Sequence, residues 1–182
     1  MTDLWLFGYG SLIWRPDFEY VEKRVSYIDG WSRRFWQGSH DHRGVPDAPG
    51  RVVTLVPDST GRCTGMVFRI TADVAVEVLR QLDYREKNGY ERHQVDCHLL
   101  PAEPCEGQTT ASSVRCLVYV ASQSNHAFLG EAPLAEIAEQ IGRSHGPSGS
   151  NREYLLRLAE ALRALGLHDE HVFKLEDLVR QG

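Results

Sequence analysis

Short apolar stretches separated by turn-forming residues fill the first two-thirds of the sequence. Residues 4–7 form an apolar run that ends at Gly8-Tyr9-Gly10, a pattern typical of a buried strand followed by a tight loop. Further strand-like stretches, rich in β-branched and aromatic residues, cover residues 25–31, 51–56, 63–70, 90–100 and 114–121.

Two pairs of these stretches are separated by turn-forming or polar residues. The cluster Asp-Ser-Thr-Gly at residues 58–61 predicts a hairpin between strands 51–56 and 63–70. Residues 90–100 and 114–121 predict a second pair, connected by the polar segment Pro101 to Ser113.

Helical spacing of apolar residues appears in four places. The first helix has Thr71 as its candidate cap and is expected to end near residues 83–84. Residues 134–141 follow the i, i+3, i+4, i+7 rule of an amphipathic helix.

Two further helices have local start and stop signals. Residues 150–153 form a capping box that opens a helix with Gly166 at its end, and Asp169 is a candidate start for the last helix. Strands followed by helices predict an α+β fold with a mostly antiparallel or mixed sheet, for which a curled, barrel-like form is one arrangement.

Composition places this chain among ordinary globular proteins. It has 182 residues, 42% of them hydrophobic, and a formal net charge of −5, so we expect a single domain over residues 1–182 and no nucleic-acid partner. No export signal or membrane-spanning run is recognisable, which favours a cytoplasmic protein that contacts no membrane.

The cysteines are consistent with the reducing environment of the cytoplasm. Cys63, Cys97 and Cys116 fall in strand-like runs and are expected to be small core residues with free thiols, whereas Cys105 lies in the polar segment. Packing is the favoured role for these side chains, with a catalytic thiol as the alternative.

The first candidate for chemistry is the loop Gly8-Tyr9-Gly10-Ser11. Two glycines after a strand let the chain turn sharply and let a ligand approach the main chain, while consecutive N–H groups suit a carboxylate or a developing oxyanion. The alternative is a plain corner between strand and loop. The loop is not a dinucleotide-binding fingerprint, because Ile13 occupies the position of the third glycine.

The second candidate is the charged segment from Asp83 to Tyr90. Charges at a helix end usually form a solvated face. The aromatic residues Tyr84 and Tyr90, with turn-forming Asn88-Gly89, also allow one carboxylate to lie at the mouth of the sheet. A Glu with apolar surroundings there would have a raised pKa and could transfer a proton near neutral pH.

Three other segments have simpler interpretations. His40 and His42 suggest a metal site only weakly, because no second ligand cluster is recognisable. The run from Arg33 to Trp36 is a poor electrostatic footprint for RNA and is better explained by packing. Ser148 lies in a loop that leads into the capping box and lacks the GxSxG context of a nucleophile.

Several blocks of sequence, in order, resemble the ChaC family of glutathione-specific γ-glutamylcyclotransferases. They begin with Phe-Gly-Tyr-Gly-Ser-Leu-Ile-Trp at residues 7–14 and continue through residues 32–39, 41–46, 49–55, 82–87, 137–141 and 146–149. Two departures are visible: Asn88 stands where the family often has glycine, and the segment 101–113 is longer and more polar than expected.

The resemblance implies a fold, a reaction and a site. The fold would be a γ-glutamylcyclotransferase-like mixed, barrel-like β-sheet with flanking α-helices, forming one ChaC-type domain over residues 1–182. The reaction would cleave the γ-glutamyl bond of reduced glutathione to give 5-oxoproline and cysteinylglycine, without a metal or nucleotide cofactor. The family's catalytic carboxylate matches Glu86, and its substrate-binding loop matches Leu6, Phe7, Gly8, Tyr9, Gly10 and Ser11.

The sequence is also compatible with two other functions. The chain could act on another γ-glutamyl amino acid or amine, or it could bind a γ-glutamyl ligand without catalysis. The oligomeric state has no signal in the sequence.

Overall fold

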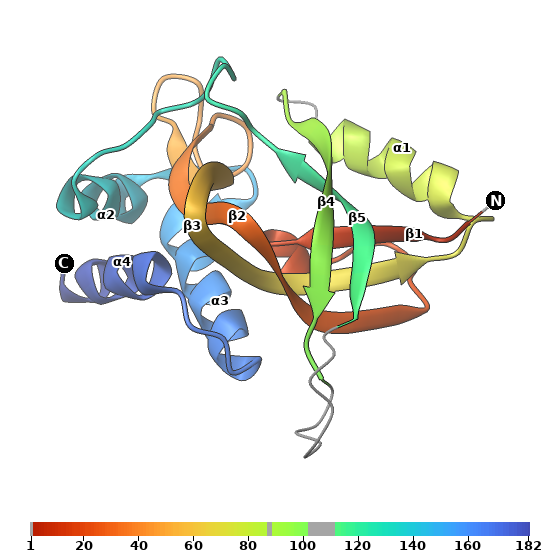
Figure 1. Ribbon diagram of the computed structural model, residues 1–182. Helices are drawn as coiled ribbons and strands as arrows, with labels where there is room; N and C mark the ends of the chain where they lie inside the picture. Colours follow the sequence, from red (N-terminus) through yellow and green to blue (C-terminus); the bar gives the residue numbers. More distant parts are fainter. Residues whose placement is uncertain (1, 87–88, 102–111) are drawn as a thin grey trace. The chain divides into compact units, whose positions relative to one another are not determined.

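Five strands form a closed barrel in the computed structural model, which describes residues 2–86, 89–101 and 112–182. The strands are β1 (Leu4–Gly8), β2 (Glu22–Ser39), β3 (Gly50–Ile70), β4 (Glu91–Leu99) and β5 (Ser113–Val120), in the order β1-β3-β2-β4-β5 (Figure 1). β1 pairs antiparallel with β3 and parallel with β5, so the sheet is mixed. The predicted α+β fold with a barrel-like sheet is confirmed.

The chain divides into two compact units. The first contains Met1–Ser32 and Pro57–Val120, and the second contains Arg33–Val56 and Ala121–Gly182. Both β2 and β3 contribute residues to each unit. A single domain over residues 1–182 stays a prediction.

The expected hairpin at residues 58–61 is wrong, because β3 continues through this polar cluster. Asp58 accepts hydrogen bonds from the Ser32 hydroxyl at 2.6 Å and from the Thr60 amide at 3.1 Å. A Cβ atom on Gly61 would lie 2.7 Å from Ser32 Oγ. The turn-forming residues therefore allow β3 to pass close to Ser32 while the strand stays extended.

The first unit carries the helix α1 (Ala75–Arg85), which packs on the outside of the strands. Its buried residues Val78 and Leu82 form a cluster with Leu6 of β1, Ile70 of β3 and Tyr119 of β5. Figure 1 shows α1 alongside β1, and both elements start from the same end of this unit.

The start of α1 differs from the prediction. Val74 is the N-cap residue and no side chain caps the helix. The carbonyl of Thr71 accepts hydrogen bonds from the amides of Val74 and Ala75, so Thr71 contributes its backbone where a hydroxyl cap was expected. The helix ends at Arg85, close to the predicted end.

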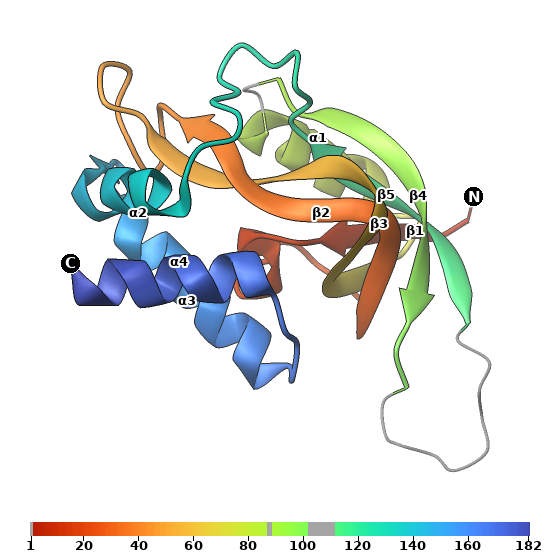
Figure 2. The same cartoon turned by 60° about the vertical axis from the view of Figure 1, so that its left-hand side comes forward.

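The second unit contains three helices that pack together: α2 (Leu134–Arg143), α3 (Asn151–Ala164) and α4 (Glu170–Gln181) (Figure 2). The predicted caps are confirmed, since Ser150 accepts from the Glu153 amide and Asp169 accepts from the Val172 amide. Gly166 has φ +68° just after α3, the left-handed conformation that commonly ends a helix.

A short two-stranded ribbon completes the second unit. Its strands are β6 (His145–Gly146) and β7 (Gly149–Ser150), which pair antiparallel. The helices bury their apolar faces in a common core, which includes Ile137, Ile141, Leu155, Leu158, Leu162 and Leu175.

Candidate functional site

The glycine loop, residues Gly8 to Ser11, connects β1 to the short 3₁₀ helix η1 (Ser11–Ile13). A Cβ atom on Gly8 would lie 2.7 Å from Leu12 Cβ, so the turn into η1 has no room for a side chain at this position. The carbonyl of Gly10 accepts from the Ile13 amide at 3.0 Å, which fixes the exit from the loop. The sequence-predicted tight loop after β1 is confirmed.

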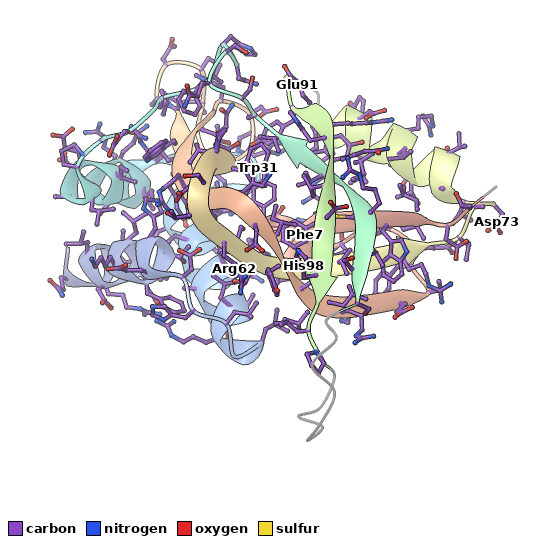
Figure 3. The ribbon with its side chains drawn as sticks, viewed as in Figure 1. Phe7, Trp31, Arg62, Asp73, Glu91 and His98 are labelled. Carbon is purple, nitrogen blue, oxygen red and sulfur yellow. The ribbon has the colours of Figure 1, made fainter. Side chains whose placement is uncertain are left out.

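Two of the predicted substrate-binding residues have buried side chains. Leu6 packs against α1, and Phe7, on the opposite face of β1, lies among the strands (Figure 3). At 0% and 1% exposure, Leu6 and Phe7 can offer a ligand their backbone alone. Tyr9 is buried as well and donates its hydroxyl to the Tyr119 carbonyl, so Ser11 is the side chain of this stretch that is most accessible to a ligand.

Glu86 is the C-cap residue of α1. Its amide donates to the carbonyl of Leu82 at 2.8 Å, so the helical hydrogen-bond pattern fixes its backbone. Its side chain is 22% exposed, which shields the carboxylate from much of the solvent but leaves it accessible. Of the rest of this segment, Lys87 and Asn88 lie outside the described residues.

Arg85 connects the two predicted parts of the site. Its Nη2 donates to Ser11 Oγ at 2.6 Å, while its Nε lies 3.7 Å from Glu86 Oε1. Its Nη1 also lies 3.4 Å from the carbonyl of Arg15, beyond η1. The fold thus brings the glycine loop and Glu86 to one guanidinium, although they are far apart in sequence.

A second polar cluster holds the last turn of α1. Tyr119 donates its hydroxyl to Asp83 Oδ1 at 2.8 Å, and Arg92 Nε donates to the same oxygen at 2.9 Å. Arg92 Nη2 bonds the other oxygen of Asp83, and Arg92 Nε lies 3.1 Å from the Tyr119 hydroxyl. Sequence reasoning missed Arg92 and Tyr119, because only the pairing of β4 with β5 places them opposite each other.

Charge and burial set the protonation of this cluster. The pKa of Asp83 is lowered because the Tyr119 hydroxyl and the Arg92 guanidinium both donate to its carboxylate. Burial raises the pKa of Tyr119, and the Asp83 carboxylate beside it raises that pKa further. At neutral pH Asp83 is therefore ionised and Tyr119 keeps its proton, the states that their hydrogen bond requires.

The arrangement in the first unit suits acid–base chemistry on a small polar ligand. A partly shielded carboxylate at the end of a helix can accept and return a proton. Backbone N–H groups in a glycine-containing turn can hold a carboxylate or a developing oxyanion.

The other candidates have structural partners. Arg33 is buried and pairs with Asp169 at 2.7 Å, which supports a packing role for the segment 33–36. His42 Nδ1 lies 3.1 Å from Ser148 Oγ, within the loops of the second unit. Cys63, Cys97 and Cys116 are buried, as predicted for core residues, while Cys105 lies outside the described residues.

The described residues contain neither a metal-binding cluster nor a membrane-spanning helix. Across residues 2–86, 89–101 and 112–182, no three His, Cys, Asp or Glu side chains are grouped so that they could hold a metal ion. No helix in the same ranges is long and apolar enough to cross a membrane.

Comparison with known sequences gives matches along nearly the whole chain. The family model of ChaC-like proteins matches residues 4–182. A glutathione-specific γ-glutamylcyclotransferase 1 from Danio rerio is 43% identical over 179 residues, which cover 96% of this chain and 88% of the relative. A glutathione-specific γ-glutamylcyclotransferase from Schizosaccharomyces pombe is 40% identical, over 98% of this chain and 93% of the relative.

Solved structures agree with these matches. The crystal structure of a γ-glutamylcyclotransferase specific to glutathione from yeast superposes with a TM-score of 0.91 at 33% identity, covering 100% of this chain and 97% of that one. The match of fold and sequence along nearly the full length shows that the chain belongs to the ChaC-like protein family.

Proposed function

We propose that this protein is a glutathione-specific γ-glutamylcyclotransferase, a lyase that converts reduced glutathione to 5-oxoproline and cysteinylglycine. Relatives at 40–43% identity carry that name. The observation that carries the proposal is the guanidinium of Arg85, which contacts Ser11 of the glycine loop and lies beside the Glu86 carboxylate.

The proposed reaction is an intramolecular acyl transfer. The α-amine of the γ-glutamyl group loses a proton to Glu86, and its nitrogen attacks the γ-carbonyl carbon to close a five-membered lactam. The bond from that carbon to the cysteine nitrogen then breaks, and Glu86 returns a proton to the departing amine. Because nucleophile and electrophile belong to one molecule, correct orientation can contribute roughly 7–11 kcal/mol to lowering the barrier.

The glycine loop is proposed to hold the substrate through backbone N–H groups of Gly8 to Ser11. These groups would bind either the α-carboxylate of the γ-glutamyl group or the oxyanion that forms on its γ-carbonyl. Both assignments use the same lack of side chains at Gly8 and Gly10, which lets a ligand approach the main chain.

The variant Glu86→Gln tests the catalytic assignment, because it keeps the shape of the side chain and removes the base. We expect the rate of 5-oxoproline formation from glutathione, measured by mass spectrometry, to fall on the order of 10²–10⁴-fold. Glu77→Gln is the matched control, since Glu77 lies in the first turn of the same helix and pairs with Arg80. Wild-type turnover by Glu86→Gln would refute the role of Glu86.

Substrate choice needs a separate measurement. Parallel assays with glutathione and γ-glutamylalanine compare the proposed substrate with the alternative class of γ-glutamyl amino acids. Preference for γ-glutamylalanine would reassign the substrate. A thermal shift with glutathione but no 5-oxoproline would instead indicate a non-catalytic γ-glutamyl-binding module.

A cytoplasmic location is part of the proposal. The buried residues Cys97 and Cys116 form no disulfide bond, as is usual in a reducing compartment. Cell fractionation with an antibody against the protein tests this location, and recovery in a membrane or secreted fraction would contradict it.

A further inference from the structure

Tyr119 lies between the helix that carries Glu86 and the strand that leads into the glycine loop. Tyr119 is 7% exposed, and its ring packs in the cluster that contains Leu6 of β1 and Leu82 of α1. Leu82 also accepts the backbone hydrogen bond of Glu86. The ring therefore belongs to the same apolar cluster as the strand that precedes the glycine loop and the helix turn that precedes Glu86.

The hydroxyl of Tyr119 reaches the last turn of α1. It donates to Asp83 at 2.8 Å, and Asp83 precedes Glu86 by three residues, a spacing that places both on neighbouring positions of a helix surface. Arg92, which pairs with Tyr119 in the sheet, holds the same carboxylate with two nitrogens. The end of α1 is thus attached to β4 and β5 by side chains as well as by packing.

The backbone of Tyr119 reaches the glycine loop. Its carbonyl accepts a 2.7 Å hydrogen bond from the hydroxyl of Tyr9, which is itself buried. One residue of β5 therefore bonds the helix turn next to Glu86 through its hydroxyl and the glycine loop through its carbonyl.

Stability alone explains this arrangement poorly. The side chains of Asp83 and Arg92 are 49% and 39% exposed, and exposed ion pairs contribute about 0–1 kcal/mol to folding. The network instead defines where the last turn of α1 lies, because a bidentate arginine and a buried hydroxyl fix one carboxylate from two directions.

We propose that Tyr119 is a positioning residue, which together with Asp83 and Arg92 orients the end of α1 so that Glu86 faces the glycine loop. This inference rests on the proposed function, since it assigns to Glu86 the role of acid and base. The exact position of Glu86 matters because a displacement of about 1 Å in a reacting group can reduce a rate roughly 100-fold.

The variant Tyr119→Phe keeps the ring in its cluster and removes the hydroxyl. We expect kcat for 5-oxoproline formation to fall roughly 10- to 100-fold with little change in KM for glutathione. Asp83→Asn, at an exposed position, is the second variant and is expected to reduce kcat in the same way even if Tyr119→Phe folds poorly. Glu77→Gln, which breaks an exposed pair on the same helix, is expected to leave kcat unchanged.

A double variant separates positioning from general damage. If Tyr119 acts through Glu86, adding Tyr119→Phe to Glu86→Gln should lower the residual rate less than twofold, because the group being positioned is already absent. Independent, multiplicative losses in the double variant would overturn the inference, as would wild-type kcat in both Tyr119→Phe and Asp83→Asn. Full activity of Glu86→Gln alone would instead overturn the proposed function, and the positioning role with it.

Discussion

The guanidinium of Arg85 donates a 2.6 Å hydrogen bond to the hydroxyl of Ser11, a residue 74 positions earlier in the chain. Arg85 is the last residue of α1, and Ser11 is the first residue of η1. Because Glu86 follows Arg85 directly, this bond links the glycine loop to the residue beside the proposed acid–base group.

Removing the Ser11 hydroxyl should therefore weaken catalysis. Hydrogen bonds to charged groups contribute about 1.5–3 kcal/mol, and about 1.4 kcal/mol corresponds to a tenfold change, so we expect Ser11→Ala to lower kcat/KM about tenfold. Steady-state turnover of glutathione measures this loss. Ser122→Ala is the control, because that hydroxyl bonds Ser124 at an exposed position of the second unit. Equal activity of both variants would contradict the link.

Gly8 should not tolerate a side chain. A Cβ atom there would lie 2.7 Å from Leu12 Cβ, so Gly8→Ala must displace η1 and is expected to cost about 1–3 kcal/mol of stability together with activity. Urea unfolding and glutathione turnover measure the two effects. Gly142→Ala in α2 is the matched control: nothing lies within 4 Å of its Cβ, and alanine should stabilise that helix by roughly 0.5–1 kcal/mol.

His171 should make the protein sensitive to mild acid. Burial, with Arg34 and Arg33 nearby, lowers its pKa from 6.5 to about 4, although Asp169 opposes this shift. Its Nε2 accepts from the Phe35 amide at 3.0 Å, a bond that requires the neutral ring.

The unfolded chain therefore binds a proton to this histidine as the pH falls below about 6.5, while the folded protein resists protonation until the pH is near 4. Stability should be fully present above pH 6.5 and decline by up to about 3 kcal/mol across that window. Urea unfolding of wild type and His171→Asn at pH 7.5, 5.5 and 4.5 measures the difference. Identical pH dependence in both proteins would contradict this role.

The cap of α3 should contribute measurably to the stability of the second unit. Ser150 Oγ accepts from the Glu153 amide at 3.1 Å, and loss of a serine cap costs about 1 kcal/mol. Ser150→Ala is expected to lower the free energy of unfolding by that amount in urea titrations, whereas Ser150→Thr should retain most of it. A Ser150→Ala protein as stable as wild type would show that the cap is dispensable.

Local signals in the sequence were sufficient for the helices of the second unit. Ser150, Asp169 and Gly166 act on backbone groups within a few residues, so their effect does not depend on distant parts of the chain. The same logic failed at Asp58, because its partners include Ser32 on another strand, and the polar cluster lies within β3 as a result.

The sequence was sufficient to predict several residues of the candidate site, but not the contacts between them. Motif blocks located Glu86 and the glycine loop, whereas Arg92 and Tyr119 belong to no motif and meet only through the register of β4 and β5. Leu6 and Phe7 were expected to bind substrate, yet their burial leaves them their backbone alone for that role.

By itself, the amino-acid order determined the helices, most of the strand segments, the α+β class and the resemblance to the family, since periodicity, caps and motifs are properties of short segments. Only the tertiary structure decided that Arg85 meets Ser11 and that Tyr119 meets Asp83 and Tyr9. Such contacts depend on strand register and helix packing, which are set by the burial of apolar side chains from the whole unit.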